Sequence, residues 1–305
     1  MKKTLTERFP YELALCVLII TGCVKDRNRI STGSAQVGSD FQIIVVDKIS
    51  EKQNIDSIVQ SYYYLPLQTD ESCLIGKVDK IMFHNKKVYI LDSQTKSIFA
   101  FEMNGKFAFK INKIGRGSGE YDNIRDFDID FSNNQLIILC TNFRKLIFYD
   151  TENGQFLREE LLDFRPLSFM SAGQKSYLFD ARFKLEENMS DNTLVILNHS
   201  DNTSTGYLTR NNYPSTERTP FSRYNEVIYY SSNYNDTVFA FRDGLLLKRY
   251  FIDFGSRKLN MNSLPEELFS DSGVLGVETD RVAPFWTRNA RVDSRVRVAQ
   301  KPVKS

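Results

Sequence analysis

Short apolar segments recur along the chain at a nearly constant interval, and this repeat limits the fold more than any other feature of the sequence. Each copy pairs two strand-like runs, such as "VYILD" (88–92) followed by "IFAF" (98–101). The second run of each pair begins at residues 98, 146, 194 and 238, so the intervals are 48, 48 and 44 residues. A period of this size, made of short strands and turns, matches one four-stranded blade of a β-propeller.

The second copy is the clearest, and its pattern predicts strands at 127–131, 136–139, 146–150 and 156–161. The run "LIIL" is apolar on both faces, as expected of a strand packed between neighbouring blades. The run "FDIDF" alternates, so Asp128 and Asp130 are expected to face away from the apolar side chains. The sequence therefore predicts an all-β propeller of four-stranded antiparallel blades.

The N-terminus has the pattern of a lipoprotein signal. Lys2, Lys3 and Arg8 precede the apolar run "LALCVLII", which is too short to span a bilayer stably, and "ITGC" then ends at Cys23. This pattern resembles a bacterial lipobox, which implies removal of residues 1–22 and lipidation of Cys23. The alternatives are an ordinary cleaved signal with a coincidental cysteine, or a poor membrane helix.

The remaining chain divides by composition into three parts. We predict a flexible tether at 23–40, a propeller domain at 41–260 and an atypical, partly disordered segment at 261–305. Because the whole chain carries +2 and residues 281–305 carry +6, the first 280 residues carry −4. No nucleic-acid partner is predicted for such a chain. The basic end is interpreted as a foreign C-terminus, or alternatively as a tail for anionic lipid or glycan.

A glycine-rich stretch, "IGRGSGEY" at 114–121, lies between the predicted strands at 107–111 and 127–131. A phosphate-binding loop would need Gly-Lys-Ser/Thr and a following helix, and neither is present. We therefore interpret the stretch as a crossover between blades, near one mouth of the central channel. The candidate residues for ligand binding, or alternatively for locking the crossover, are Arg116, Glu120, Tyr121, Arg125 and Asp126.

Three segments carry a family resemblance: residues 62–92, 114–130 and 235–255. They resemble the six-bladed β-propeller lipoproteins of Bacteroidota, which are similar in shape to NHL and TolB-like propellers. The likeness covers residues 41–260 and implies the fold, a lipid anchor and an envelope location, but supplies no ligand and no catalytic residues.

The number of blades is a separate question. Six blades need roughly 280 residues, whereas 265 follow from Phe41 onward. Four copies are visible, and early strands at 41–46 and 62–67 are of the kind that complete a last blade. We therefore expect an incomplete ring of four to five blades.

Catalytic side chains are scarce. The two histidines, His84 and His199, lie in predicted turns and are interpreted as surface residues, so no metal site, no cofactor and no catalytic residues are predicted. Cys73 and Cys140 are expected to be free thiols rather than a disulfide. A carboxylate pair for glycoside cleavage is harder to dismiss, because several acids lie near inner strands: Asp92, Asp126, Asp128 and Asp130.

The leading functional hypothesis is a non-enzymatic binding or scaffold protein, anchored by lipid to the outer membrane of the cell envelope. Its partners would be the membrane together with a glycan, a peptide or an outer-membrane protein. The residues after Cys23 do not distinguish the periplasmic from the surface face. The first alternative is an envelope polysaccharide hydrolase or lyase using carboxylates at the channel mouth, and the second is a truncated, non-functional family member.

Overall fold

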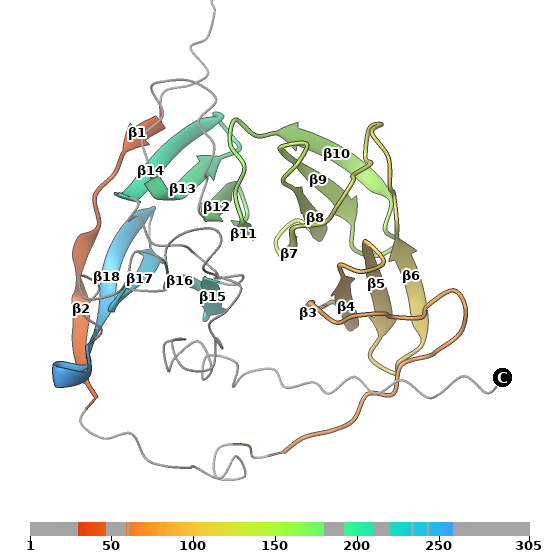
Figure 1. The fold of residues 1–305 in the computed structure, drawn as a ribbon, viewed down its shortest axis with the longest axis horizontal. Coiled ribbons are helices and arrows are strands. Elements are labelled where there is room, and N and C mark those ends of the chain that lie inside the picture. The colour runs from red at the N-terminus through yellow and green to blue at the C-terminus, as the bar shows by residue number, and fades with distance from the viewer. Residues whose placement is uncertain are drawn as a thin grey trace, which may run out of the picture.

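The computed structural model describes residues 30–46, 59, 61–179, 192–209, 220–232, 235–242 and 244–258. These residues form β-strands and one short 3₁₀ helix, Gly255–Arg257. The strands build four sheets that fan out around a common centre, as Figure 1 shows. None of the helical structure in these ranges is long and apolar enough to cross a membrane.

Each sheet is one propeller blade whose four successive strands pair antiparallel. The first blade contains β3 (Lys80–His84), β4 (Lys87–Asp92), β5 (Ser97–Glu102) and β6 (Phe107–Ile111). The second contains β7 (Asp126–Asp130), β8 (Gln135–Cys140), β9 (Lys145–Asp150) and β10 (Phe156–Leu161). The third contains β11 (Ser168–Ala172), β12 (Lys175–Phe179), β13 (Asn192–Asn198) and β14 (Thr203–Thr209). The fourth contains β15 (Phe221–Tyr224), β16 (Val227–Tyr230), β17 (Thr237–Arg242) and β18 (Leu245–Asp253).

The repeat in the sequence is confirmed strand by strand. The segments that begin at 98, 146, 194 and 238 are the third strands of the four blades: β5, β9, β13 and β17. All four strands predicted for the second copy are present, each within one residue of its expected bounds. The first strands, β3, β7, β11 and β15, lie nearest the centre of the fan (Figure 1).

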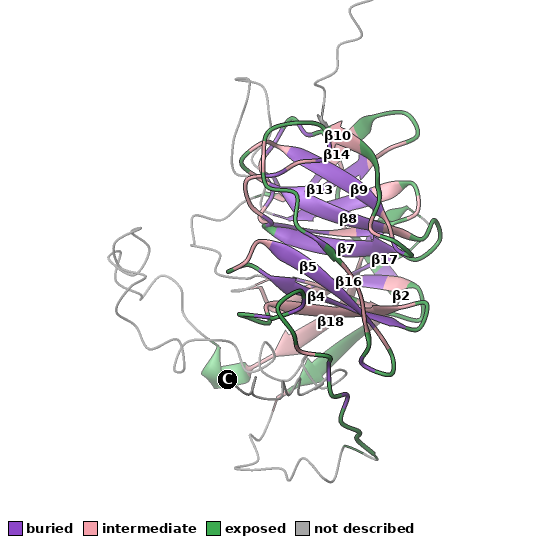
Figure 2. Ribbon diagram, turned by 90° about the vertical axis from the view of Figure 1, so that its right-hand side faces the viewer, coloured by how far each residue is buried: buried purple, intermediate pink, exposed green. Residues whose placement is uncertain are grey.

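The core lies between blades, and alternate residues of one strand face different neighbours. On β9, Ile147 and Tyr149 pack towards the first blade, whereas Leu146 and Phe148 pack towards the third. The middle strands of the second blade, β8 and β9, are therefore buried on both faces, as Figure 2 shows. Each sheet buries its apolar side chains against the next copy, because one sheet alone cannot cover both of its faces.

The segment before the first blade covers that blade's outward face. Leu65, Leu67, Cys73 and Ile75 pack with side chains of β4 and β5 such as Phe99. Only Leu67 in this stretch takes part in a bridge, so the strand predicted at 62–67 is wrong. The segment fills the place of a neighbouring sheet with single side chains rather than with a paired strand.

Two strands from the N-terminal part of the chain lie along the outer edges of later blades. β1 (Ile30–Thr32) pairs parallel with β14, and β2 (Gln36–Val45) pairs parallel with β18. We call β1 and β2 the N-terminal belt. The prediction of a tether reaching residue 40 is therefore wrong for residues 30–32 and 36–40. The strand expected at 41–46 exists, but it is an added fifth strand of the fourth blade.

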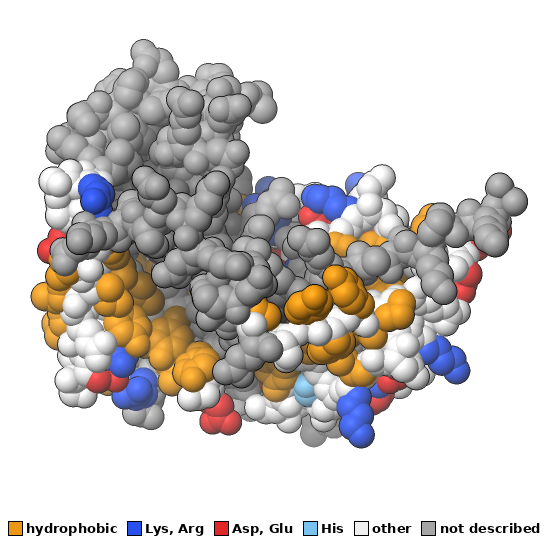
Figure 3. All heavy atoms as spheres, turned by 90° about the horizontal axis from the view of Figure 1, so that it is seen from below, with side chains coloured by type: hydrophobic (Ala, Val, Ile, Leu, Met, Phe, Trp, Pro, Cys, Tyr) orange, Lys and Arg blue, Asp and Glu red, His pale blue; other side chains and the backbone are white. Residues whose placement is uncertain are grey.

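Exposed apolar side chains gather at the two ends of the fan. Figure 3, which views the molecule from below relative to Figure 1, shows exposed apolar side chains on its left and right sides. On the sheet that contains β15–β18 and β2 they include Val37, Ile43, Val45, Tyr224 and Leu245. The predicted signal peptide, Cys23 and the atypical segment from residue 261 onward lie outside the described residues.

Candidate functional site

The innermost strand of the second blade, β7, carries an acid at every second position. Phe127 and Ile129 are buried in the core shared with the first blade. Asp126, Asp128 and Asp130 point to the other side of the strand and are also buried, with exposed fractions of 5%, 1% and 3%. The orientation predicted from the alternation is confirmed, and it places carboxylates next to the third blade.

Two of these carboxylates bind the inner edge of β11. Asp126 Oδ2 accepts a hydrogen bond from the backbone N–H of Phe169 at 3.2 Å, and Asp128 Oδ2 accepts one from Ser171 at 2.7 Å. Both the acids and the amides are two residues apart, because both strands have the same period. The side chains of one blade thus satisfy backbone groups that the innermost strand of the next blade leaves without a ladder partner.

Lys80, on β3, brings a positive charge from the first blade. Its Nζ lies 2.9 Å from Asp126 Oδ1 and donates to the carbonyl oxygen of Phe127 at 2.5 Å. Burial by itself would lower the pKa of Lys80, but the charges of Asp126 and Asp128 outweigh it and raise that pKa. Lys80 is therefore positively charged and ties the first blade to the second.

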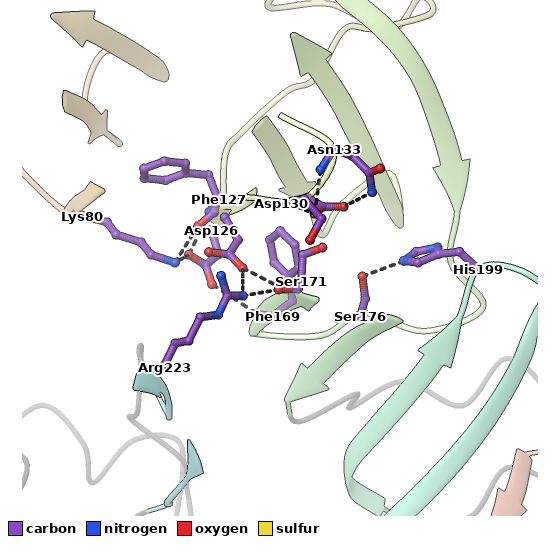
Figure 4. Close-up of polar contacts among 12 residues, drawn as sticks. Lys80, Asp126, Phe127, Asp130, Asn133, Phe169, Ser171, Ser176, His199 and Arg223 are labelled. Carbon is purple, nitrogen blue, oxygen red and sulfur yellow. Dashed lines mark hydrogen bonds and ion pairs between the residues drawn. The ribbon is translucent and has the colours of Figure 1, made fainter. Parts of the chain in front are cut away.

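Arg223, on β15, brings a second positive charge from the fourth blade. Its guanidinium donates to the carbonyl oxygen of Ser171 and lies 3.8 Å from Asp128 Oδ2. It also covers the ring of Phe131 at 4.7 Å. All four blades thus contribute to one group, which we call the inner polar cluster (Figure 4): Lys80, Asp126, Asp128, Ser171 and Arg223.

The cluster is not fully hydrogen bonded. Asp128 Oδ1 and Ser171 Oγ are buried and have no hydrogen-bond partner among the described residues. Burial raises the pKa of Asp128, and the nearby charges of Lys80 and Arg223 offset only part of that effect. A buried carboxylate with an unused oxygen is costly for folding, and such groups are common at binding and catalytic sites.

The acids that the sequence suggested for glycoside cleavage fall into two groups. Asp130 and Asp92 each accept backbone N–H groups of the turn that follows their own strand. Asp126 and Asp128 share one face, but Asp126 uses both oxygens, and Asp128 one oxygen, for protein donors. Asp126 and Asp128 are therefore engaged in contacts that join the second blade to its two neighbours.

The glycine-rich crossover at 114–121 is held by its own hydrogen bonds. Ile114 and Tyr121 form a parallel bridge, and Glu120 Oε2 accepts the N–H of Gly117 at 2.7 Å. Tyr121 is fully buried and its hydroxyl donates to main-chain oxygens, including that of Ile111. Burial raises the pKa of Tyr121 to about 12. A Cβ at Gly115 would overlap the carboxylate of Glu120, so a larger residue there would have to displace that side chain.

The crossover lies beside the outer strands of the second blade. Gly119 donates its N–H to Glu159 of β10 at 3.0 Å and accepts a hydrogen bond from the hydroxyl of Tyr149. Of the five predicted site residues, Asp126 alone belongs to the inner polar cluster. Arg125, which is exposed, donates to the carbonyl oxygen of Leu167 at 3.1 Å, and Arg116 is exposed on the crossover.

A second polar group joins the second and third blades. His199 Nε2 lies 2.8 Å from Ser176 Oγ, and His199 Nδ1 lies 2.6 Å from Glu160 Oε2 (Figure 4 shows the first contact). The connectivity is that of a hydrolytic triad, but Ser176 is fully buried and offers no surface to a substrate. The interpretation of His199 as a surface residue is wrong, because only 9% of its side chain is exposed.

Sequence reasoning missed Lys80, Arg223, Ser176 and the role of His199. A weak signal existed for the first two, since each is an isolated charge in the first strand of a repeat. No signal existed for Ser176, because its partner His199 lies 23 residues away, and Glu160, which binds His199, lies on another blade. Cys73 and Cys140 are buried free thiols, as expected. The described residues contain no group of three metal-binding side chains.

Comparisons with known proteins agree with this architecture. The family model DUF5128, described as a 6-bladed beta-propeller, matches residues 32–274. No curated protein matches the chain. A similar solved structure is a Bacteroides fragilis protein whose description provisionally calls it exported. The identity is 20% and the TM-score 0.58, and the match covers 70% of this chain and 60% of that one.

Two other solved structures are less similar. A member of the duf4221 family from Bacteroides vulgatus has 14% identity and a TM-score of 0.43, with 64% of this chain and 62% of that one covered. BamB from Moraxella catarrhalis has 16% identity and a TM-score of 0.35, with 56% and 47% covered. The chain thus spans 47% to 62% of the length of the three structures. At 20% identity, the likeness to the Bacteroides fragilis protein shows the fold alone.

Proposed function

Because the chain belongs to the DUF5128 family of six-bladed β-propellers, we propose that it is a non-enzymatic binding or scaffold protein of the cell envelope, anchored to the outer membrane by lipid on Cys23. The lipobox-like "ITGC" supports the anchor. The similarity to a Bacteroides protein described as exported supports an extracytoplasmic location.

One observation carries the binding role: the inner polar cluster has buried, unused hydrogen-bonding atoms. Asp128 Oδ1 can accept, and Ser171 Oγ can donate or accept, without breaking a contact to a described residue. Both atoms are buried, so this role requires the inner strands to move apart locally when a ligand enters. Lys80 and Arg223 balance Asp126 and Asp128 in formal charge. A cluster without net charge favours a neutral hydrogen-bonding group, such as a glycan hydroxyl or a peptide amide, over an ion.

The same contacts support binding rather than hydrolysis. A general acid and a base must reach the substrate, whereas three of the four carboxylate oxygens of Asp126 and Asp128 accept hydrogen bonds from the protein. Release of reducing sugar from an envelope polysaccharide by the purified protein would support the hydrolase alternative instead.

The binding role is tested with Asp128→Asn, which keeps the shape of the side chain and removes its charge. Wild-type protein should bind at least one member of a panel of envelope glycans and synthetic peptides saturably, and the variant should bind about tenfold more weakly. Asp163→Asn is the control, since Asp163 is exposed and does not belong to the inner polar cluster. Equal affinity of wild type and Asp128→Asn would contradict the assignment of the cluster.

The anchor is tested separately with Cys23→Ala. Wild-type protein should sediment with membranes and incorporate a labelled fatty acid, and the variant should do neither. Failure of the wild-type protein to incorporate the labelled fatty acid would disprove the lipid anchor. The binding role would still be decided by its own test.

A further inference from the structure

The outer edges of the third and fourth blades are already occupied by added strands. β1 lies along β14, where Ile30 pairs with Ser204 and Thr32 with Gly206. β2 lies along β18, where Gln42 pairs with Tyr250 and Ile44 with Ile252. Both pairings are parallel. The outermost strand of a blade in this fold is therefore able to accept an extended segment from elsewhere.

The outermost strand of the second blade, β10, has an open edge of the same kind. The order of its sheet is β10-β9-β8-β7, so β10 has a paired strand on one side only. The N–H of Leu162 donates to Arg144 on the β9 side at 2.6 Å. Backbone groups alternate in direction along a strand. Those of Arg158 and Glu160 therefore also point to β9, and those of Glu159 and Leu161 point outward.

The side chains of β10 leave this edge accessible. Leu157 is 45% exposed and Leu161 is 80% exposed. The charged residues of the strand, which would otherwise discourage pairing, are engaged within the protein: Glu159 with Lys145, and Arg158 and Glu160 with each other. No hydrogen bond to the outward backbone groups of Glu159 and Leu161 is present within the described residues.

The outer edge of the first blade is different. The N–H of Phe107, at the start of β6, donates to Gln68 Oε1 at 3.0 Å. The N–H of Gln68 in turn donates to the carbonyl oxygen of Gly105 at 2.8 Å. The segment before the first blade thus lies against one end of β6. Among the four outer edges, that of β10 is the most open in the part of the chain that the structure describes.

We propose that the β10 edge, residues 158–161, is a docking site for an extended segment of a partner polypeptide, which adds to the second blade as a parallel fifth strand. Backbone hydrogen bonds to Glu159 and Leu161 hold the segment, and apolar side chains at alternate positions contact Leu157 and Leu161. The belt strands on β14 and β18 provide the structural precedent. The site is on the rim of the fan and does not depend on the inner polar cluster.

The experiment uses a fluorescent synthetic peptide with the sequence of β2, QVGSDFQIIV, because this segment already pairs with an outer strand of the same fold. Full-length protein is titrated and fluorescence anisotropy is measured. Leu161→Pro removes an outward N–H without removing a bond to β9, and should weaken binding about tenfold. Leu161→Ala keeps the N–H and should weaken binding less.

A second measurement leaves the protein unchanged, in case Leu161→Pro fails to fold. Two versions of the peptide are N-methylated at opposite sets of alternate residues. Each version thus loses the backbone N–H donors along one edge of the peptide. One of them should lose binding and the other should retain it. Equal binding of both, or of Leu161→Pro and wild type, overturns the proposal. So does a dimer in light scattering that Leu161→Pro dissociates, because the edge would then be taken by a second copy.

Discussion

At the scale of single residues, charged side chains in this propeller complete the hydrogen bonding of neighbouring strands. Asp126 and Asp128 bind the N–H groups of β11, and Lys80 binds a carbonyl of β7. The alternation in "DFDID" predicted the direction of the acids. It did not predict their partners, because Lys80 lies 46 residues from Asp126, one full blade away. Such contacts follow from how blades stack, which local sequence does not encode.

Glu160 provides a pH-dependent test at this scale. Burial acts to raise the pKa of Glu160, but the hydrogen bond and charge of His199, with Arg158, hold it below its usual value of 4.5. A carboxylate whose pKa is lower in the folded state adds stability above the unfolded value, and this stability is lost as the pH falls through the folded pKa. Glu160→Gln should therefore cost about 1–2 kcal/mol at pH 7.

The measurement is urea unfolding of wild type and Glu160→Gln at pH 7 and below pH 4. The difference in the free energy of unfolding should shrink at the lower pH, since wild-type Glu160 becomes protonated there. Glu71→Gln, an exposed carboxylate, is the control and should have little effect at either pH. A difference that stays constant with pH would contradict the pairing with His199.

At the scale of elements, the sequence predicted strands best where they repeat. The third strands stand out because they are apolar and recur 44–48 residues apart. The segment 62–67 was expected to be a strand, since its three tyrosines have strand propensity. Propensity failed there because Leu65 and Leu67 bury their side chains against the first blade, and only Leu67 takes part in a bridge.

Gly105, in the hairpin between β5 and β6, tests this cover over the first blade. Its φ of +84° favours glycine, and a Cβ there would overlap the carbonyl oxygen of Pro66. Gly173, in the hairpin between β11 and β12, has a φ of +57° and open space around it. Gly173→Ala should cost about 1 kcal/mol in the free energy of unfolding, and Gly105→Ala clearly more. Equal losses of unfolding free energy for the two variants, measured by urea unfolding, would show that Pro66 does not pack against Gly105.

At the scale of the whole molecule, four blades are described in a chain whose family is six-bladed. The number of repeats visible in the sequence predicted this arc. The belt was not predictable, because parallel pairing with β14 and β18 joins residues more than 170 positions apart. The inner polar cluster was predictable only in part, for the same reason. The sequence of one repeat indicates which residues its own blade contributes, but not which residues of the next blade they contact.

The belt gives a prediction for the assembled fold. Removal of residues 1–46 should expose the edges of β14 and β18, and exposed edges promote association between chains. Light scattering should then show oligomers that grow with protein concentration. Removal of residues 1–29 alone keeps both belt strands and should leave the protein in its original state. Identical behaviour of the two truncations would show that the belt does not protect these edges.

The short β1 and the longer β2 also set how the molecule bears load. Tension applied at the N-terminal side acts first on the three residues of β1, which pair with β14, and then on the ten residues of β2, which pair with β18. We therefore expect the belt to detach from the blades in two steps, with β1 released before β2.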